Sequence, residues 1–204
     1  NAPETERLLS LVGGGDRAAF DLLFARHRSY LRRVVELRLD QRMQARVDPS
    51  DVVQEAQMEA FRRLPDYLAR RPMAFRLWLR KTVQERLLMA ERFHRGASRR
   101  AVGREVPLND YSSLHWAKHL QASADTPSQL VTTREKARQV RQAVAHLSAI
   151  DREILVLRNL EELSNRETAE LLGIDPAAAS QRYGRALLRL RRVLTDRGIL
   201  EAGA

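Results

Sequence analysis

The chain of 204 residues contains no cysteine. Disulfides and cysteine-based zinc sites are therefore excluded, and a cytoplasmic location fits this composition. The sequence also lacks any run of about 18 apolar residues, so we expect no membrane insertion. No alternating pattern typical of strands and no internal repeat is visible. These absences leave an all-α protein, and its 44% hydrophobic and 30% charged residues indicate a folded chain rather than a disordered one.

Lysine is scarce as well, occurring only at Lys81, Lys118 and Lys136, so nearly all of the 36 cations are arginine. Against 26 acidic residues they give a formal net charge of +10. Arginine makes planar, bidentate contacts to phosphate and guanine, which suits a nucleic-acid partner. A GC-rich genome would produce the same preference for arginine over lysine. The net charge nevertheless favours a polyanionic partner.

The first half of the chain predicts three helices, at residues 16–39, 49–64 and 72–93. Asp48 is placed to cap the second helix and Pro49 to occupy its first turn. Pro65 is expected to end that helix and Pro72 to open the next. The glycines of segment 13–15 lack the Lys-Ser/Thr of a phosphate-binding loop, so they predict a hinge.

Helical periodicity breaks after Gly96 and resumes near residue 127. We therefore expect two helical domains, residues 1–95 and 127–204, joined by an extended linker at 96–126. A linker of this length without regular structure is unusual, which suggests that it has a function or is mobile.

The segment from Ser164 to Arg192 predicts a helix-turn-helix. Ser164 and Glu167 form a capping box, and Gly173 supplies the left-handed turn four residues after the small Ala169. Asp175-Pro176 restarts a helix in which Ala179 would face back toward the first helix. The alternative is a plain helical hairpin with an arginine-rich solvated face.

The second helix of this motif would present side chains that can contact bases or phosphates. Glutamine can bond adenine bidentately and arginine can bond guanine. Between residues 181 and 197 there are six arginines and one acid, which favours duplex DNA as the partner. The predicted contacts are Ser180, Gln181, Arg182, Arg185 and Arg189.

A largely polar stripe of Asp51, Gln54, Glu55 and Met58 falls on one side of the helix predicted at 49–64. Positions separated by three and four residues share a helix face. Such a stripe commonly faces solvent and has no partner. The alternative is that the stripe binds another protein, and the sequence around it favours this alternative.

The segment Asp51–Ala56 resembles region 2.2 of bacterial sigma factors, and Phe75–Leu79 resembles the Phe-x-x-Trp-Leu of regions 2.3 to 2.4. In the C-terminal half, Asp151–Arg158 and Ala169–Ile174 resemble region 4. Two matched domains with only a linker between them resemble the extracytoplasmic-function (ECF) class. The resemblance covers nearly the whole chain except residues 96–126.

This resemblance implies a transcription initiation factor that binds core RNA polymerase, directs it to −35 and −10 promoter elements and assists melting. It implies no enzyme activity, cofactor or metal. The partners that it implies are the polymerase β′ clamp helices and β flap, promoter DNA, and the anti-sigma factor that commonly holds members of this class. The β′ contacts would be Asp51, Gln54, Glu55 and Met58. The −10 contacts would be Arg70, Phe75, Arg76, Trp78, Arg80 and Lys81, with Trp78 alternatively a core residue. The helix-turn-helix residues given above would read the −35 element.

The sequence departs from the sigma pattern at Arg71, where many members have glycine. Glu85 and Met89 replace an asparagine and an aspartate common in region 2.4, and Gly184 interrupts the second helix of the motif. These departures bear on the −10 preference. The alternative function classes are an ordinary helix-turn-helix regulator that binds a palindrome as a dimer, and an enzyme. The enzyme is disfavoured because the five histidines form no metal-like set.

Overall fold

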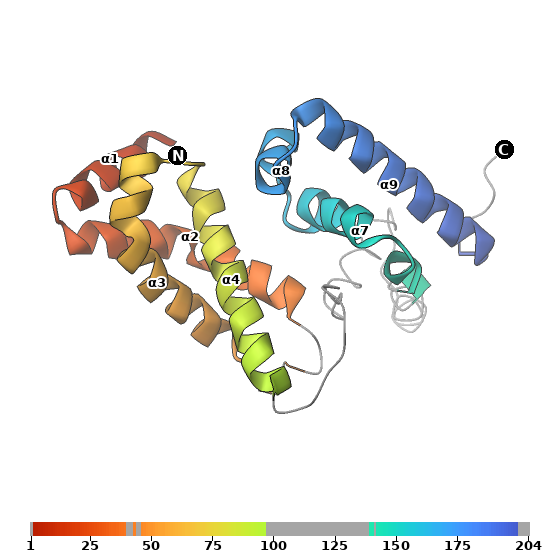
Figure 1. Cartoon of the computed structure of the whole chain (residues 1–204), viewed down its shortest axis with the longest axis horizontal. Helices are drawn as coiled ribbons and strands as arrows, with labels where there is room; N and C mark the ends of the chain where they lie inside the picture. Colours follow the sequence, from red (N-terminus) through yellow and green to blue (C-terminus); the bar gives the residue numbers. More distant parts are fainter. Residues whose placement is uncertain (1, 40–42, 44–45, 97–138, 141, 200–204) are drawn as a thin grey trace, which may run out of the picture. The chain divides into compact units, whose positions relative to one another are not determined.

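A computed structural model describes residues 2–39, 43, 46–96, 139–140 and 142–199. Within these ranges all regular structure is helical, as expected (Figure 1). The chain divides into two compact units. The N-terminal unit contains α1, nearly all of α2, α3 and α4, and the helices described from Gln139 onward belong to the C-terminal unit. The predicted linker lies, except for its first residue, outside the described residues.

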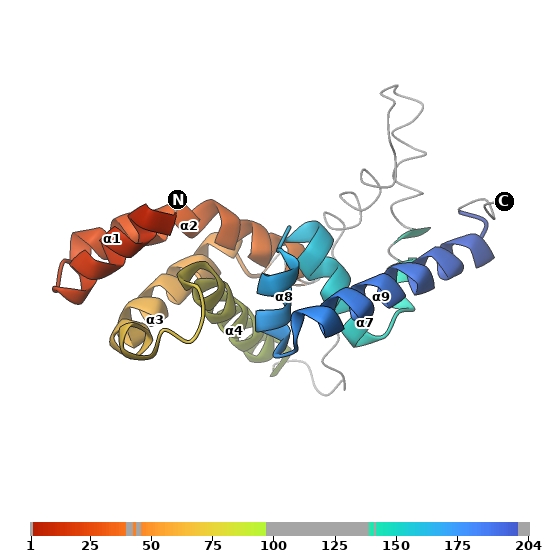
Figure 2. The same ribbon diagram turned by 90° about the horizontal axis from the view of Figure 1, so that it is seen from above.

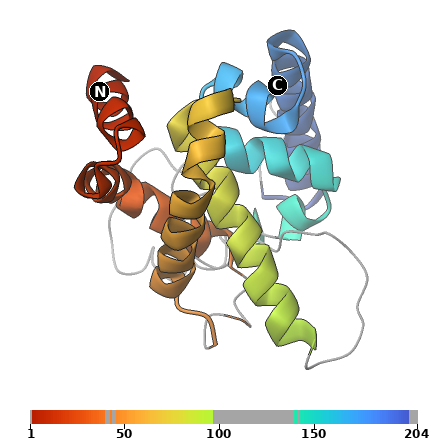
Figure 3. The same ribbon diagram turned by 60° about the vertical axis from the view of Figure 1, so that its left-hand side comes forward.

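The N-terminal unit consists of α1 (Ala2–Gly13), α2 (Arg17–Arg38), α3 (Pro49–Arg70) and α4 (Phe75–Gly96). Helix α1 was not predicted. The segment expected to be a hinge is the turn between α1 and α2, where Gly15 has φ +93°. Helices α3 and α4 pack against each other (Figures 1 and 3), and α1 also contacts α3. The apolar residues predicted at helical spacing are mostly buried, and the large fully buried ones include Phe20, Phe24, Leu31, Leu77 and Leu79.

Aspartates cap two of these helices. The Asp16 carboxylate accepts a hydrogen bond from the Ala19 N–H at 3.1 Å. The Asp48 carboxylate accepts one from the Ser50 N–H at 2.7 Å, with Pro49 in the first turn as predicted. Each carboxylate satisfies an amide that the helix leaves without an internal partner.

The prediction that Pro65 ends its helix is wrong, since α3 continues to Arg70. Proline removes one backbone donor, but Leu64 and Tyr67 on either side of it are buried and keep the helix packed, while Pro65 itself is exposed. The helix ends where Arg71 adopts the left-handed conformation at φ 39° and donates its N–H to the Tyr67 carbonyl. Helix α4 accordingly begins three residues later than expected.

A buried carboxylate links α3 to α4. Glu59 is 7% exposed and forms ion pairs with Arg62, Arg63 and Arg86 of these two helices. Arg63 also donates to Glu85 of α4 at 2.7 Å. The hydrogen bond from Arg62, together with the positive charges of Arg63 and Arg86, lowers the pKa of Glu59 against the opposing effect of burial. The network therefore holds the two long helices in register.

The C-terminal unit contains helical residues at 139–140 and 142–145, then α7 (Ala149–Leu155), the π-helix η1 (Val156–Leu160), α8 (Asn165–Leu172) and α9 (Pro176–Asp196). Helix α9 packs along α7 and α8 (Figures 1 and 2). Ser148 caps α7 as its sequence predicts, accepting from the Asp151 N–H. The π-helix was not predicted.

The helix-turn-helix is confirmed in its local geometry. Ser164 and Glu167 make both hydrogen bonds of the capping box, and Gly173 ends α8 at φ 64°. Asp175 caps α9, which begins at Pro176. Ala169 and Ala179 are 2% and 0% exposed, so the two helices approach closely at these small residues.

The sequence pattern of α9 predicts Leu187, Leu190, Val193 and Leu194 on its inner face. Ala186, Leu190 and Leu194 are buried, whereas Leu187, expected on this face, is 38% exposed.

No helix in the described ranges is long and apolar enough to cross a membrane. Among the same residues, no cluster of three or more histidine, aspartate or glutamate side chains could hold a metal ion.

Candidate functional site

The side chains of α9 that are predicted to contact the −35 element differ in their exposure to solvent. Ser180, Gln181 and Arg185 are exposed, whereas Arg182 is half-buried at the edge of the packed face. Gln181 and Arg185 are four residues apart and so project from the same side of the helix. An amide and a guanidinium side by side, each able to bond a base edge bidentately, form a surface suited to reading DNA.

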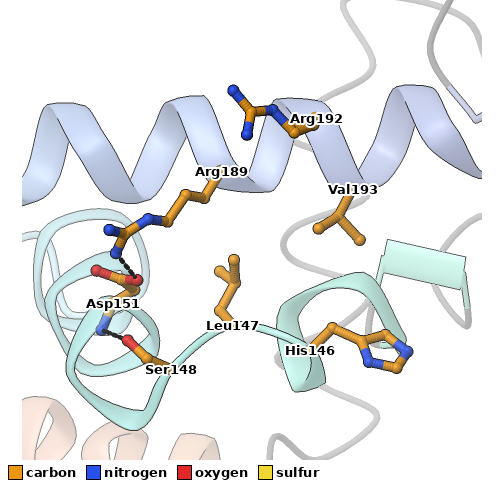
Figure 4. A pocket seen from close by; sticks show the side chains of 7 residues that line it. All are labelled: His146, Leu147, Ser148, Asp151, Arg189, Arg192 and Val193. Atoms are coloured by element: carbon orange, nitrogen blue, oxygen red, sulfur yellow. Dashed lines mark hydrogen bonds and ion pairs between the residues drawn. The ribbon is translucent and has the colours of Figure 1, made fainter.

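Arg189 lies differently from the other four residues. Its guanidinium Nη1 bonds the Asp151 carboxylate of α7 at 2.5 Å, and the Asp151 side chain is only 5% exposed (Figure 4). Both residues line a hollow of about 320 Å³ between α7 and α9. In Figure 4 the side chain of Arg192, also on the rim, points away from Asp151. Arg189 therefore joins α9 to α7, which its sequence position did not reveal.

Two hydrogen bonds fix the orientation of α9 relative to η1 and α8. The Tyr183 hydroxyl donates to the Asn159 side-chain oxygen of η1 at 2.9 Å. Asn165, at the start of α8, donates to the Pro176 carbonyl at the start of α9 at 2.7 Å. Arg158 lies over the Tyr183 ring, 5.1 Å from its centroid. The exposed face of α9 is thus positioned by side chains on η1 and α8.

The α3 stripe is fully accessible. Asp51, Gln54, Glu55 and Met58 are all exposed, and Met58 is 64% exposed. The opposite side of α3 is buried, at Val52, Val53, Ala56, Glu59, Ala60, Leu64 and Tyr67. The apolar spacing of this helix predicts Phe61 on the buried side as well, but Phe61 is 40% exposed. Methionine is a common residue of adaptable protein-binding surfaces, so the exposed Met58 fits the reading of the stripe as a protein-binding surface.

The side chains predicted to meet the −10 element surround an aromatic cluster at the start of α4. The Trp78 ring lies 4.7 Å from Tyr67 and 5.6 Å from Phe75, centroid to centroid. Tyr67 donates its hydroxyl to the Met73 carbonyl in the loop between α3 and α4 at 3.0 Å. Trp78 is half-buried, so it combines a packing role with a partly accessible ring.

Two of the predicted −10 contacts are buried. Phe75 and Arg80 are each 3% exposed, and Arg80 Nη1 bonds the Gln84 side chain at 2.6 Å. The expectation that Arg80 meets DNA phosphates is therefore wrong for this conformation. Arg76 is half-buried with its guanidinium 4.2 Å from the Tyr30 centroid. Arg70 and Lys81 are exposed and can reach a phosphate.

His27 of α2 lies beneath this site. The His27 ring is 5.9 Å from that of Phe75, centroid to centroid. Burial, and then the positive charges of Arg76 and Arg26, lower the pKa of His27. His27 is therefore neutral in the folded protein at neutral pH.

The sequence matches known proteins over nearly its full length. The family model described as sigma-70, region 4 matches residues 137–190. The ECF RNA polymerase sigma-E factor of Haemophilus influenzae is 26% identical over 181 residues, which cover 89% of this chain and 90% of that protein. The ECF RNA polymerase sigma factor SigM of Mycobacterium tuberculosis is 30% identical over 196 residues, 96% of this chain and 86% of that protein. The chain belongs to the ECF sigma factors.

A solved structure shares the fold of this sigma factor. CnrH in complex with the cytosolic domain of CnrY superposes with a TM-score of 0.55 at 22% identity, covering 95% of this chain and 98% of that one. By sequence, the RNA polymerase sigma factor CnrH of Cupriavidus metallidurans is 28% identical over 196 residues, 95% of this chain and 96% of that protein. The all-α fold class expected from the sequence is confirmed.

As an ECF sigma factor, the protein is a transcription initiation factor that acts with RNA polymerase and is not an enzyme. An ordinary helix-turn-helix regulator is not favoured, because the relatives match the N-terminal unit as well as the motif. The function expected from the sequence resemblance is therefore confirmed at the level of the family.

Proposed function

We propose that this sigma factor reads the −35 element with the exposed side of α9, chiefly through Gln181 and Arg185. The observation that carries the proposal is the pairing of these two base-reading side chains on one accessible helix side, in a helix-turn-helix with intact caps. Ser180 and Arg182 flank them and contribute at the edges. Arg189 supports the fold through Asp151 and contributes to DNA binding only through its charge.

The α3 stripe is the proposed surface for the β′ clamp helices of core polymerase. Asp51, Gln54 and Glu55 offer two carboxylates and an amide to basic side chains, and the exposed Met58 supplies an apolar contact. Its accessibility along two turns of a single helix fits a helical partner lying across it. The β flap is the proposed second contact on polymerase, as the family resemblance implies.

The −10 element is proposed to pass along the start of α4. The exposed cations Arg70 and Lys81 would contact phosphates, and the accessible part of Trp78, with Arg76 beside it, would receive an unstacked base. Phe75 and Arg80 would act from beneath by holding the Trp78 ring and the helix. Base unstacking at this point would assist promoter melting.

The proposed place of action is the cytoplasm, where core polymerase and promoter DNA are found. CnrH was solved in complex with the cytosolic domain of CnrY. The proposal also includes a protein partner that binds this sigma factor. It would be an anti-sigma factor, as the family resemblance implies.

The test of −35 reading is transcription by reconstituted holoenzyme from a DNA library randomised over the −35 and −10 windows, with the transcripts sequenced. Gln181→Ala and Arg185→Ala should each relax base preference at particular −35 positions, by about 5-fold to 150-fold. Arg191→Ala, which removes an equal charge six residues further along α9 than Arg185, should lower transcription uniformly across sequences. Unchanged −35 preference in both reading variants would refute the proposal.

The test of core binding is co-elution of the full chain with purified core polymerase. Gln54→Ala combined with Glu55→Ala should weaken holoenzyme formation without loss of helical content. Asp66→Ala serves as the control, because Asp66 is an exposed acid near the far end of the same helix. Normal holoenzyme formation by the double variant would show that the stripe only faces solvent and does not bind core polymerase.

A further inference from the structure

Gly184 lies in the interior of α9, a 21-residue helix. Glycine there destabilises a helix relative to alanine, because it adds backbone freedom to the unfolded chain. The usual structural reasons for glycine do not apply. Its φ is not positive, unlike that of Gly173 at the turn, and a Cβ added to Gly184 would meet no atom within 4 Å. Neither backbone geometry nor packing within the C-terminal unit therefore requires glycine at this position.

The position of Gly184 on the helix is more informative. It lies three residues after Gln181 and four before Leu188, so these three share one side of α9. That side is away from the packed face formed by Ala186 and Leu190. Leu188 is 68% exposed. A missing side chain and an exposed apolar one thus lie on the same stripe as the proposed base-reading glutamine.

We propose that Gly184 lets the backbone of α9 approach the −35 duplex closely, and so sets how deeply Gln181 and Arg185 reach into the major groove. A helix with its side chains is about 10–12 Å across, and the major groove is about 12 Å wide. With so little clearance, a side chain at the point of closest approach would hold the helix away from the bases. This inference rests on the proposed function of α9 and adds to it a positioning residue that contributes no side-chain contact.

The charge of the surrounding helix identifies duplex DNA as the approaching partner. Residues 181–197 carry six arginines and one acid, which suits the phosphates on either side of a groove. A protein partner that packed against Gly184 through an apolar ridge would have to leave Arg185 beside it desolvated or paired with an acid. Duplex DNA accounts both for the close approach at Gly184 and for the arginines around it.

The test compares Gly184→Ala and Gly184→Leu with the unaltered full chain in two measurements. Thermal unfolding followed by circular dichroism should show a midpoint about 4 °C higher for Gly184→Ala, since alanine is the better helix former. In holoenzyme on the library randomised over the −35 and −10 windows, the same variant should lose about fivefold or more of its −35 selectivity, and Gly184→Leu should lose more. A more stable protein that discriminates less well cannot be explained by unfolding.

Unchanged or improved −35 selectivity in Gly184→Ala would overturn the inference. If Gln181→Ala and Arg185→Ala still lose selectivity in that case, the reading role of α9 stands and only the role of Gly184 fails. If all of these variants keep normal −35 selectivity, the proposed function of α9 has failed as well. Reduced core binding by Gly184→Ala with intact −35 selectivity would show that a protein surface, and not DNA, lies against this glycine.

Discussion

Replacing Arg189 by alanine tests whether this arginine is a structural residue or a DNA contact. In the structure its guanidinium bonds Asp151, whose side chain is 5% exposed, whereas the Arg189 side chain is itself 58% exposed. A hydrogen bond to a charged group contributes about 1.5–3 kcal/mol, and an exposed ion pair about 0.2–1 kcal/mol. For a pair with one partner buried, we expect Arg189→Ala to lower the free energy of unfolding by about 1.5 kcal/mol.

The assay is urea unfolding of the full chain followed by circular dichroism, as a double-mutant cycle with Asp151→Asn. The two single variants should each be destabilised, and the double variant by less than their sum, with a coupling energy of about 1 kcal/mol. Arg192→Ala is the control, because Arg192 lines the same hollow but points away from Asp151 (Figure 4). Additive effects together with a loss of −35 selectivity in Arg189→Ala would refute the structural role.

Three further predictions concern single contacts. Glu59→Gln should lower the free energy of unfolding by about 2 kcal/mol in urea, because a buried carboxylate bonded to Arg86 and its neighbours loses its charge; an unchanged midpoint would contradict this. Since the pKa of folded His27 is lowered, the unfolded chain gains the proton at a higher pH, about 6.5, than the folded protein does. The stability of the native protein should therefore decline below that pH more steeply than that of His27→Asn, and parallel profiles would argue against it. Ser164→Ala should cost about 1 kcal/mol through loss of the α8 cap, and amide exchange at the start of α8 that stays as slow as in the native protein would show that the cap contributes little.

The helix-turn-helix could be predicted closely because its geometry is set by local interactions. The capping box at Ser164, the left-handed Gly173 and the Asp175 cap are each determined by residues within four positions along the chain. The core-facing positions of α2 followed from apolar periodicity for the same reason. Function was predictable to the level of the family because its motifs occur in order along nearly the whole chain.

The error at Pro65 arose because tertiary packing outweighs a local sequence signal. Pro65 has the sequence signature of a helix end, but burial of Leu64 and Tyr67 outweighs the lost backbone donor. Helix α1 was missed, although Leu8, Leu9 and Val12 at helical spacing are buried and could have indicated it.

Arginines were the least predictable part of the candidate site. Arg80 and Arg189 have the same sequence character as Lys81 and Arg185, but one is buried and the other is bonded to an acid 38 residues away. Sequence spacing places a charge on a helix, whereas the partner that neutralises it comes from another element. The accessible contacts of α9 could thus be separated from the structural ones only with the fold in hand.

The central claim is that this chain makes core RNA polymerase specific for promoters. Its most direct test is run-off transcription by purified core polymerase on the library randomised over the −35 and −10 windows, with and without the full chain. We predict discrete transcripts that depend on the chain and share sequence preferences in both windows, together with co-elution of the chain and the core enzyme. Absence of both the promoter-specific transcripts and the co-elution would contradict the account.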